Sequence, residues 1–91
     1  MSKIQIEHGP SPQRLKHLGV EDWPIWTKEE SEFAWTYDEQ EVCYLLEGHV
    51  VVVPHGGEPV TLVQGDLATF PAGMKCTWRV LKAVRKHYWF G

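Results

Sequence analysis

Side chains that could carry out chemistry lie mainly in two segments of the chain. The segment SEFAWTYDEQEVCYLLEG carries Trp35, Tyr37 and Glu41, and the segment GDLATFPAGMKCTWRV carries Cys76 and Trp78. Aromatic rings can stack on a flat ligand, a carboxyl group can transfer protons, and a thiol can anchor a ligand or assist a proton transfer. The two segments therefore predict a site made of aromatic, carboxyl and thiol groups.

Short strands and tight turns must position these groups. A helix is predicted only over residues 12–18, because Ser11 suits the N-cap, Pro12 the first helical position and Gly19 the stop. Period-two alternation separated by Gly and Pro predicts eight or nine short strands. The segments expected to form them are residues 3–8, 24–27, 33–37, 41–46, 49–53, 59–63, 67–70, 75–81 and 84–90. This pattern is typical of an all-β sandwich or barrel.

Strand alternation also predicts which side chains share a face. Trp35 and Tyr37 are two residues apart, as are Cys76 and Trp78, so each pair is expected to point the same way, into the barrel. Basic residues near the C-terminus alternate with apolar ones, and we interpret them as one solvated strand face: Lys75, Arg79, Lys82, Arg85 and Lys86.

The spacing of the turns resembles the two sequence motifs of the cupins. Glu41, followed after six residues by Gly48, resembles the end of the first motif, and the pattern G-x5-P-x-G-x2 that leads from Gly65 to Cys76 resembles the second. The whole chain is similar to the small single-domain cupins related to the ureidoglycine aminohydrolase group. The resemblance implies one cupin domain over residues 1–91, folded as a double-stranded β-helix (an RmlC-like jelly-roll barrel) with one short N-terminal helix.

The resemblance also implies where a cupin would hold its metal. The usual three His and one Glu of the cupin motifs correspond here to Trp35, Tyr37, Glu41 and Cys76. The ureidoglycine aminohydrolases have Glu, His, His and Gln around manganese at these places, and none of those stands at its matching place. An indole nitrogen only donates, a neutral Tyr is a poor ligand, and a carboxylate and a thiolate prefer different metals. Because a catalytic metal usually needs three protein ligands, we predict no cofactor, and a divalent metal is disfavoured.

Glu41 needs a partner if it points into the barrel. Burying a carboxylate in apolar surroundings is costly unless the group is paired or protonated. Tyr37 or Cys76 could donate a hydrogen bond to it, or Arg79 or Lys75 could neutralise it from the rim.

The residues leave three functions open. The first is metal-free binding of a small molecule, with Trp35, Tyr37, Glu41, Cys76 and Trp78 as the ligand-binding residues. The second is an enzyme with Glu41, Tyr37 and Cys76 as catalytic residues, for which the resemblance suggests ureidoglycine-like or other small polar nitrogen compounds. The third is a structural or interaction barrel whose interior is plugged by side chains.

Composition limits the partners. The chain has 91 residues, a net charge of −3 and 12% aromatic residues. The acidic balance disfavours nucleic acid, because a phosphate backbone needs a basic face. Apolar stretches such as residues 50–53 are too short to span a membrane, and the N-terminus lacks the pattern of a signal peptide.

Location and assembly are expected from the cysteines and the chain ends. Two Cys 33 positions apart form no zinc motif, and we expect a cytoplasmic protein with reduced thiols. A homodimer is expected, because a strand around Ile4 and Ile6 would have a free edge and Trp residues gather near both ends of the chain.

Overall fold

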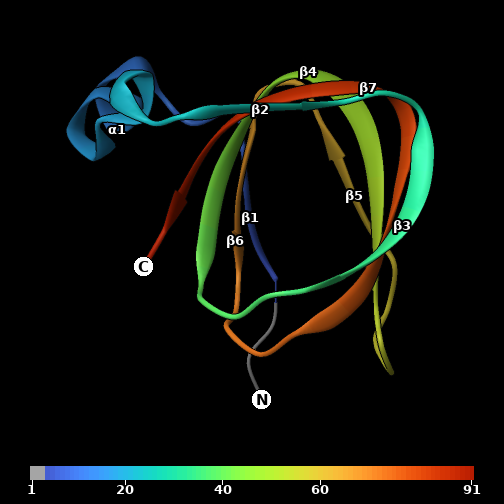
Figure 1. Ribbon diagram of the computed structural model, residues 1–91. Helices are drawn as coiled ribbons and strands as arrows, with labels where there is room; N and C mark the ends of the chain where they lie inside the picture. Colours follow the sequence, from blue (N-terminus) through green and yellow to red (C-terminus); the bar gives the residue numbers. More distant parts are fainter. Residues whose placement is uncertain (1–3) are drawn as a thin grey trace.

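A computed structural model describes residues 4–91 and has seven antiparallel strands in this range (Figure 1). An α-helix, α1 (Pro12–Leu18), and a 3-10 helix, η1 (Val20–Asp22), lie between the first two strands. The strands are β1 (Gln5–His8), β2 (Ile25–Lys28), β3 (Ser31–Thr36), β4 (Glu41–Pro54), β5 (Val60–Val63), β6 (Asp66–Phe70) and β7 (Lys75–Phe90). The predicted all-β barrel with one short helix is confirmed, whereas η1 was not predicted. Lys3, which the first predicted strand included, lies outside the described residues.

The helix forms where the capping residues predict it. The Ser11 hydroxyl accepts a hydrogen bond from the Arg14 backbone N–H at 3.1 Å, and the Gly19 N–H closes the other end on the Lys16 carbonyl. The helix lies outside the barrel (Figure 1) and has no buried residue. Within residues 4–91 no helix is long and apolar enough to cross a membrane.

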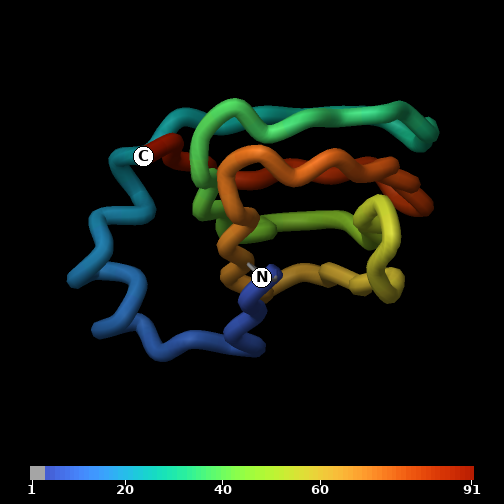
Figure 2. The backbone as a smooth tube through the Cα atoms, turned by 90° about the horizontal axis from the view of Figure 1, so that it is seen from below, coloured from blue at the N-terminus to red at the C-terminus, as the bar shows by residue number. Residues whose placement is uncertain are grey.

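The sheet curls around two long strands, β4 and β7, which pair with each other along most of their length. The first half of β4 also pairs with β6 and the second half with β5, while β7 pairs first with β3 and then with β2. Figure 2 shows this order in a view from below, with β3, β7, β4 and β5 in succession. The two long strands therefore contribute to both halves of the barrel.

The sequence predicted too many strand breaks. Residues 41–46 and 49–53 are one strand, β4, and residues 75–81 and 84–90 are one strand, β7. Gly48 has φ +118° and lies among register shifts between Leu45 and Val50, so it bends the strand instead of ending it. The structure therefore has seven strands within residues 4–91, where eight or nine were expected.

The close approach of β4 to β7 explains the glycine at this bend. A Cβ at Gly48 would lie 2.8 Å from the Val84 Cα and 2.9 Å from the Ala83 carbonyl oxygen. Both neighbours are backbone atoms, so they cannot move aside without displacing β7. Position 48 thus requires glycine, because the positive φ and the short distance to the β7 backbone both exclude a larger residue.

We expect Gly48→Ala to lower the free energy of unfolding by about 3 kcal/mol or more, from backbone strain and overpacking together. Gly56→Ala is the matched control, because Gly56 also has positive φ (+75°) but no atom lies within 4 Å of the position that a Cβ would take there. It should cost only about 1 kcal/mol. Urea unfolding measures both, and equal losses would show that the contact with β7 is unimportant.

Candidate functional site

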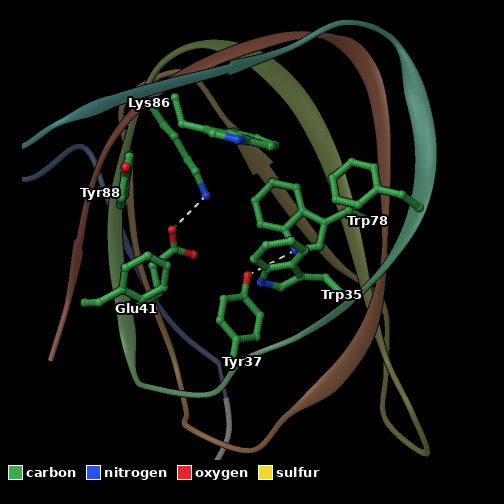
Figure 3. Close-up of a pocket in the computed structure, with 9 residues that line it drawn as sticks. Trp35, Tyr37, Glu41, Trp78, Lys86 and Tyr88 are labelled. Atoms are coloured by element: carbon green, nitrogen blue, oxygen red, sulfur yellow. Dashed lines mark hydrogen bonds and ion pairs between the residues drawn. The ribbon is translucent and has the colours of Figure 1, made fainter.

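An aromatic pocket of about 200 Å³ opens into the barrel between β2, β3, β4 and β7 (Figure 3). Seven of its nine lining side chains are aromatic, and the other two form an ion pair. The lining residues are Trp26, Phe33, Trp35, Tyr37, Glu41, Trp78, Lys86, Tyr88 and Phe90. Most of the aromatic residues of the chain, five Trp, three Tyr and three Phe, are therefore gathered around one cavity.

Strand pairing explains this gathering. Side chains of residues directly opposite each other in antiparallel strands lie on the same face. Trp26 is opposite Lys86, and Phe33 is opposite Trp78. Because β7 supplies one member of both pairs, its inward face joins β2 and β3 into one wall.

The pocket contains a buried ion pair. Lys86 Nζ lies 3.0 Å from Glu41 Oε2, and the two side chains are only 6% and 5% exposed. The ammonium also lies over the rings of Trp78 and Trp26, 4.5 Å and 4.9 Å from their centroids. The charge of Lys86 is thus stabilised by a carboxylate and by two indole faces.

The partner of Glu41 differs from those proposed from the sequence. Arg79 instead pairs with Glu32 at the surface, with 3.1 Å between Nε and Oε1, and Lys75 is exposed. The interpretation of Lys86 as part of one solvated basic face is wrong, because Arg85 and Lys86 are consecutive and must point to opposite faces. Lys86 has the strand parity of Trp78 and Tyr88, and that parity could have identified it.

Tyr37 adds a second polar group to the pocket. Its hydroxyl oxygen accepts a hydrogen bond from Trp78 Nε1 at 3.1 Å, and its ring stacks on Phe70 with centroids 5.0 Å apart. Burial, and then the negative charge of Glu41, raise the pKa of Tyr37 well above its ordinary value. The hydroxyl therefore keeps its proton and can donate it in a further hydrogen bond.

Cys76 does not line the pocket, although it was predicted to share the site. Its thiol lies 3.7 Å from the Trp35 carbonyl oxygen, to which it can donate. Burial raises the pKa of Cys76 to about 11 and that of Cys43 to about 12. Both free cysteines are therefore protonated at neutral pH and are poor nucleophiles and metal ligands. The other four predicted site residues do come together in the pocket: Trp35, Tyr37, Glu41 and Trp78.

The residues at the cupin metal positions do not fit a metal ion. Glu41 is already paired with an ammonium, Cys76 is a protonated thiol, and Trp35 offers no lone pair. Within residues 4–91 no three His, Cys, Asp or Glu side chains are grouped to hold a metal. Lys86 supplies the positive charge beside Glu41 instead.

The second carboxylate oxygen of Glu41 is open to the pocket. Glu41 Oε1 has no hydrogen-bond partner in residues 4–91. Every buried side-chain N or O atom in this range has a partner. An oxygen without a partner is therefore not buried, and Glu41 Oε1 is accessible from the pocket. The site can thus accept a hydrogen bond at Glu41 and donate from Tyr37 and Lys86.

A β barrel with two Gly-containing motifs, one that runs from β3 into β4 (residues 35–48) and one that runs from the turn before β6 into β7 (residues 65–76), is typical of the cupin class. The chain belongs to the family of EutQ-like cupin domains, whose family model matches residues 15–88. The predicted cupin fold is confirmed. The match does not single out the ureidoglycine aminohydrolase group.

Solved structures support the same assignment. A DUF861 family protein from Thermotoga maritima is 52% identical, with 98% of this chain and 100% of that chain covered and a TM-score of 0.94. The Clostridium difficile EutQ protein is 26% identical over 70% of this chain and 50% of its own, with a TM-score of 0.64. A putative ethanolamine utilization protein Q from Salmonella typhimurium is also 26% identical, over 70% of this chain and 51% of its own, with a TM-score of 0.64. This chain thus spans about half the length of the two EutQ proteins. A comparison with curated proteins found no match.

We expect Lys86→Met to lower the free energy of unfolding by about 3–5 kcal/mol, because it leaves the buried Glu41 carboxylate without its partner. The double variant Glu41→Leu, Lys86→Met should recover most of that loss, since neither charge remains. Urea unfolding at pH 7 measures both.

Arg79→Met is the control, because it breaks an exposed ion pair and should cost less than about 1 kcal/mol. The pairing would be contradicted if the double variant lost as much as the single variants Glu41→Leu and Lys86→Met added together.

Proposed function

We propose that this protein binds a small, flat organic molecule in the aromatic pocket without a metal ion. The observation that carries the proposal is the enclosure of one Glu41–Lys86 ion pair by seven aromatic side chains. A mostly apolar cavity with a few convergent polar groups is typical of small-molecule sites. A cavity of about 150 Å³ can hold benzene, so about 200 Å³ suits one ring or two fused rings.

Two observations disfavour an interior plugged by side chains. The cavity has open volume beside Glu41, and two of its lining residues, Trp35 and Phe90, are 45% and 40% exposed. The cavity is therefore open to solvent beside these two side chains. A ligand can therefore reach the ion pair without unfolding the barrel.

Turnover of a small polar nitrogen compound is the second candidate function. It is favoured by the free Oε1 of Glu41, which could take up and return a proton, and by the Tyr37 hydroxyl, which could hold the substrate with a hydrogen bond. Ureidoglycine is the first compound to test, on resemblance alone. Cys76 is the weakest of the proposed catalytic residues, because its thiol lies outside the lining.

We expect indole and uracil, as probe rings, to bind in isothermal titration calorimetry with and without EDTA. Trp35→Ala should weaken binding of the better probe by about 5-fold to 150-fold, since stacking on an aromatic side chain contributes about 1–3 kcal/mol. Trp89→Ala is the matched control, because Trp89 is similarly exposed (53%) but does not line the pocket.

Loss of binding in EDTA, equal effects of the two substitutions, or no binding of either ring would contradict metal-free binding in this pocket. Ammonia release from ureidoglycine by the same samples separates turnover from binding. A Glu41→Gln variant should abolish that release if Glu41 transfers the proton.

A homodimer remains part of the proposal, together with a cytoplasmic location in which the two free thiols stay reduced. The Trp residues near the chain ends, which were part of the reason to expect a dimer, have other roles. Trp26 lines the pocket, and Trp23 stacks on Trp89 with ring centroids 6.5 Å apart. The dimer is therefore supported mainly by β1, which pairs with β6 on one side and with no other described strand.

Sedimentation at high micromolar concentration should give a particle of about twice the 10.5 kDa chain mass, because pairing of two β1 edges would cover both. A particle of one chain mass under those conditions would rule out the dimer.

A further inference from the structure

Three polar groups in the pocket have hydrogen-bonding capacity that no described residue uses. Lys86 Nζ has three hydrogens and one hydrogen bond, to Glu41 Oε2. Glu41 Oε1 accepts none, and the Tyr37 hydroxyl accepts from Trp78 but donates to no described residue. Figure 3 shows the Glu41 carboxyl group between the Lys86 ammonium and the Tyr37 hydroxyl. The pocket thus presents a donor, an acceptor and a donor in that order.

The charge of the site restricts the ligand further. Glu41 and Lys86 neutralise each other at 3.0 Å, and both side chains are almost fully buried. A ligand with a net charge would bring an unpaired charge into this apolar cavity, which is costly. A ligand without net charge is therefore favoured.

The walls restrict its shape. Phe33 and Trp78 are nearly parallel, with 16° between their planes, and the Trp26 ring meets Trp78 edge to face. Trp35 meets Tyr37 edge to face on the side of the polar groups. Flat aromatic walls around about 200 Å³ suit a planar ring that turns one polar edge toward Glu41.

We propose that the ligand is a neutral planar heterocycle with a cyclic imide edge, in which an N–H stands between two carbonyl groups. One carbonyl would accept from Lys86 and the other from Tyr37, and the N–H would donate to Glu41 Oε1. This edge complements all three free groups at once. The inference rests on the proposed function, because it names the class of molecule that the same pocket binds.

The two N-methyl isomers of uracil test the imide directly. 1-Methyluracil keeps the carbonyl, N–H, carbonyl edge, whereas 3-methyluracil has the same atoms but a methyl group in place of that N–H. We expect 1-methyluracil to bind at least about tenfold more tightly in calorimetry, because a site built to hydrogen-bond a group rejects the analogue that lacks it. Equal affinities would overturn the imide assignment.

The variant Glu41→Gln tests whether Glu41 accepts the hydrogen bond from the N–H of the ligand. The Lys86 ammonium should hold the amide oxygen, which turns the amide NH₂ toward the place of Oε1 and sets two donors against each other. The variant should therefore bind the two isomers with similar affinities. A preserved preference would exclude Glu41 as the acceptor and overturn the proposal.

Indole separates this inference from the proposed function. If indole binds the wild-type protein and neither methyluracil does, the imide assignment fails and the aromatic binding pocket stands. If none of the three compounds binds, both fail. Because the isomer comparison uses the wild-type chain, it holds even if Glu41→Gln does not fold.

Discussion

The arrangement of the barrel interior depends on the buried ion pair between Glu41 and Lys86. Removing two charges from water costs several kcal/mol for each ion. One contact at 3.0 Å offsets this cost only if other groups also interact with the ammonium and the carboxylate. The faces of Trp26 and Trp78 supply part of that compensation to the ammonium. The aromatic cluster thus contributes contacts to the Lys86 ammonium in addition to being part of the packing of the barrel.

The same pair links the fold to the site. Glu41 begins β4 and Lys86 lies near the end of β7, and the register of these strands places Glu41 opposite Phe90 and Leu45 opposite Lys86. A slip of one residue would turn Lys86 to the solvent and leave Glu41 buried alone. The site therefore depends on the paired segment before the bend, because the register shifts around Gly48 begin only after Leu45.

Local patterns in the sequence predicted much of this, and long-range contacts account for what they missed. Turn spacing and alternation identified the barrel, the helix and the inward direction of Trp35, Tyr37, Glu41 and Trp78. Gly48 was interpreted as a strand end, because a bend and a turn have the same local signature and only the neighbouring strand distinguishes them. Lys86 was missed because its partner lies 45 residues away, and a basic residue in a basic segment is ordinarily solvated.

A lysine beside the cupin Glu position changes what the barrel can contribute chemically. A divalent metal would offer several open coordination positions and act as a Lewis acid. An ammonium offers only hydrogen bonds and a single charge, and here Glu41 already balances that charge. Interactions in the pocket then depend on the pattern of donors and acceptors and on contact with aromatic faces. These are the properties by which a site distinguishes neutral molecules of similar size, so the exchange of a metal for Lys86 favours recognition by shape and hydrogen bonding over activation by charge.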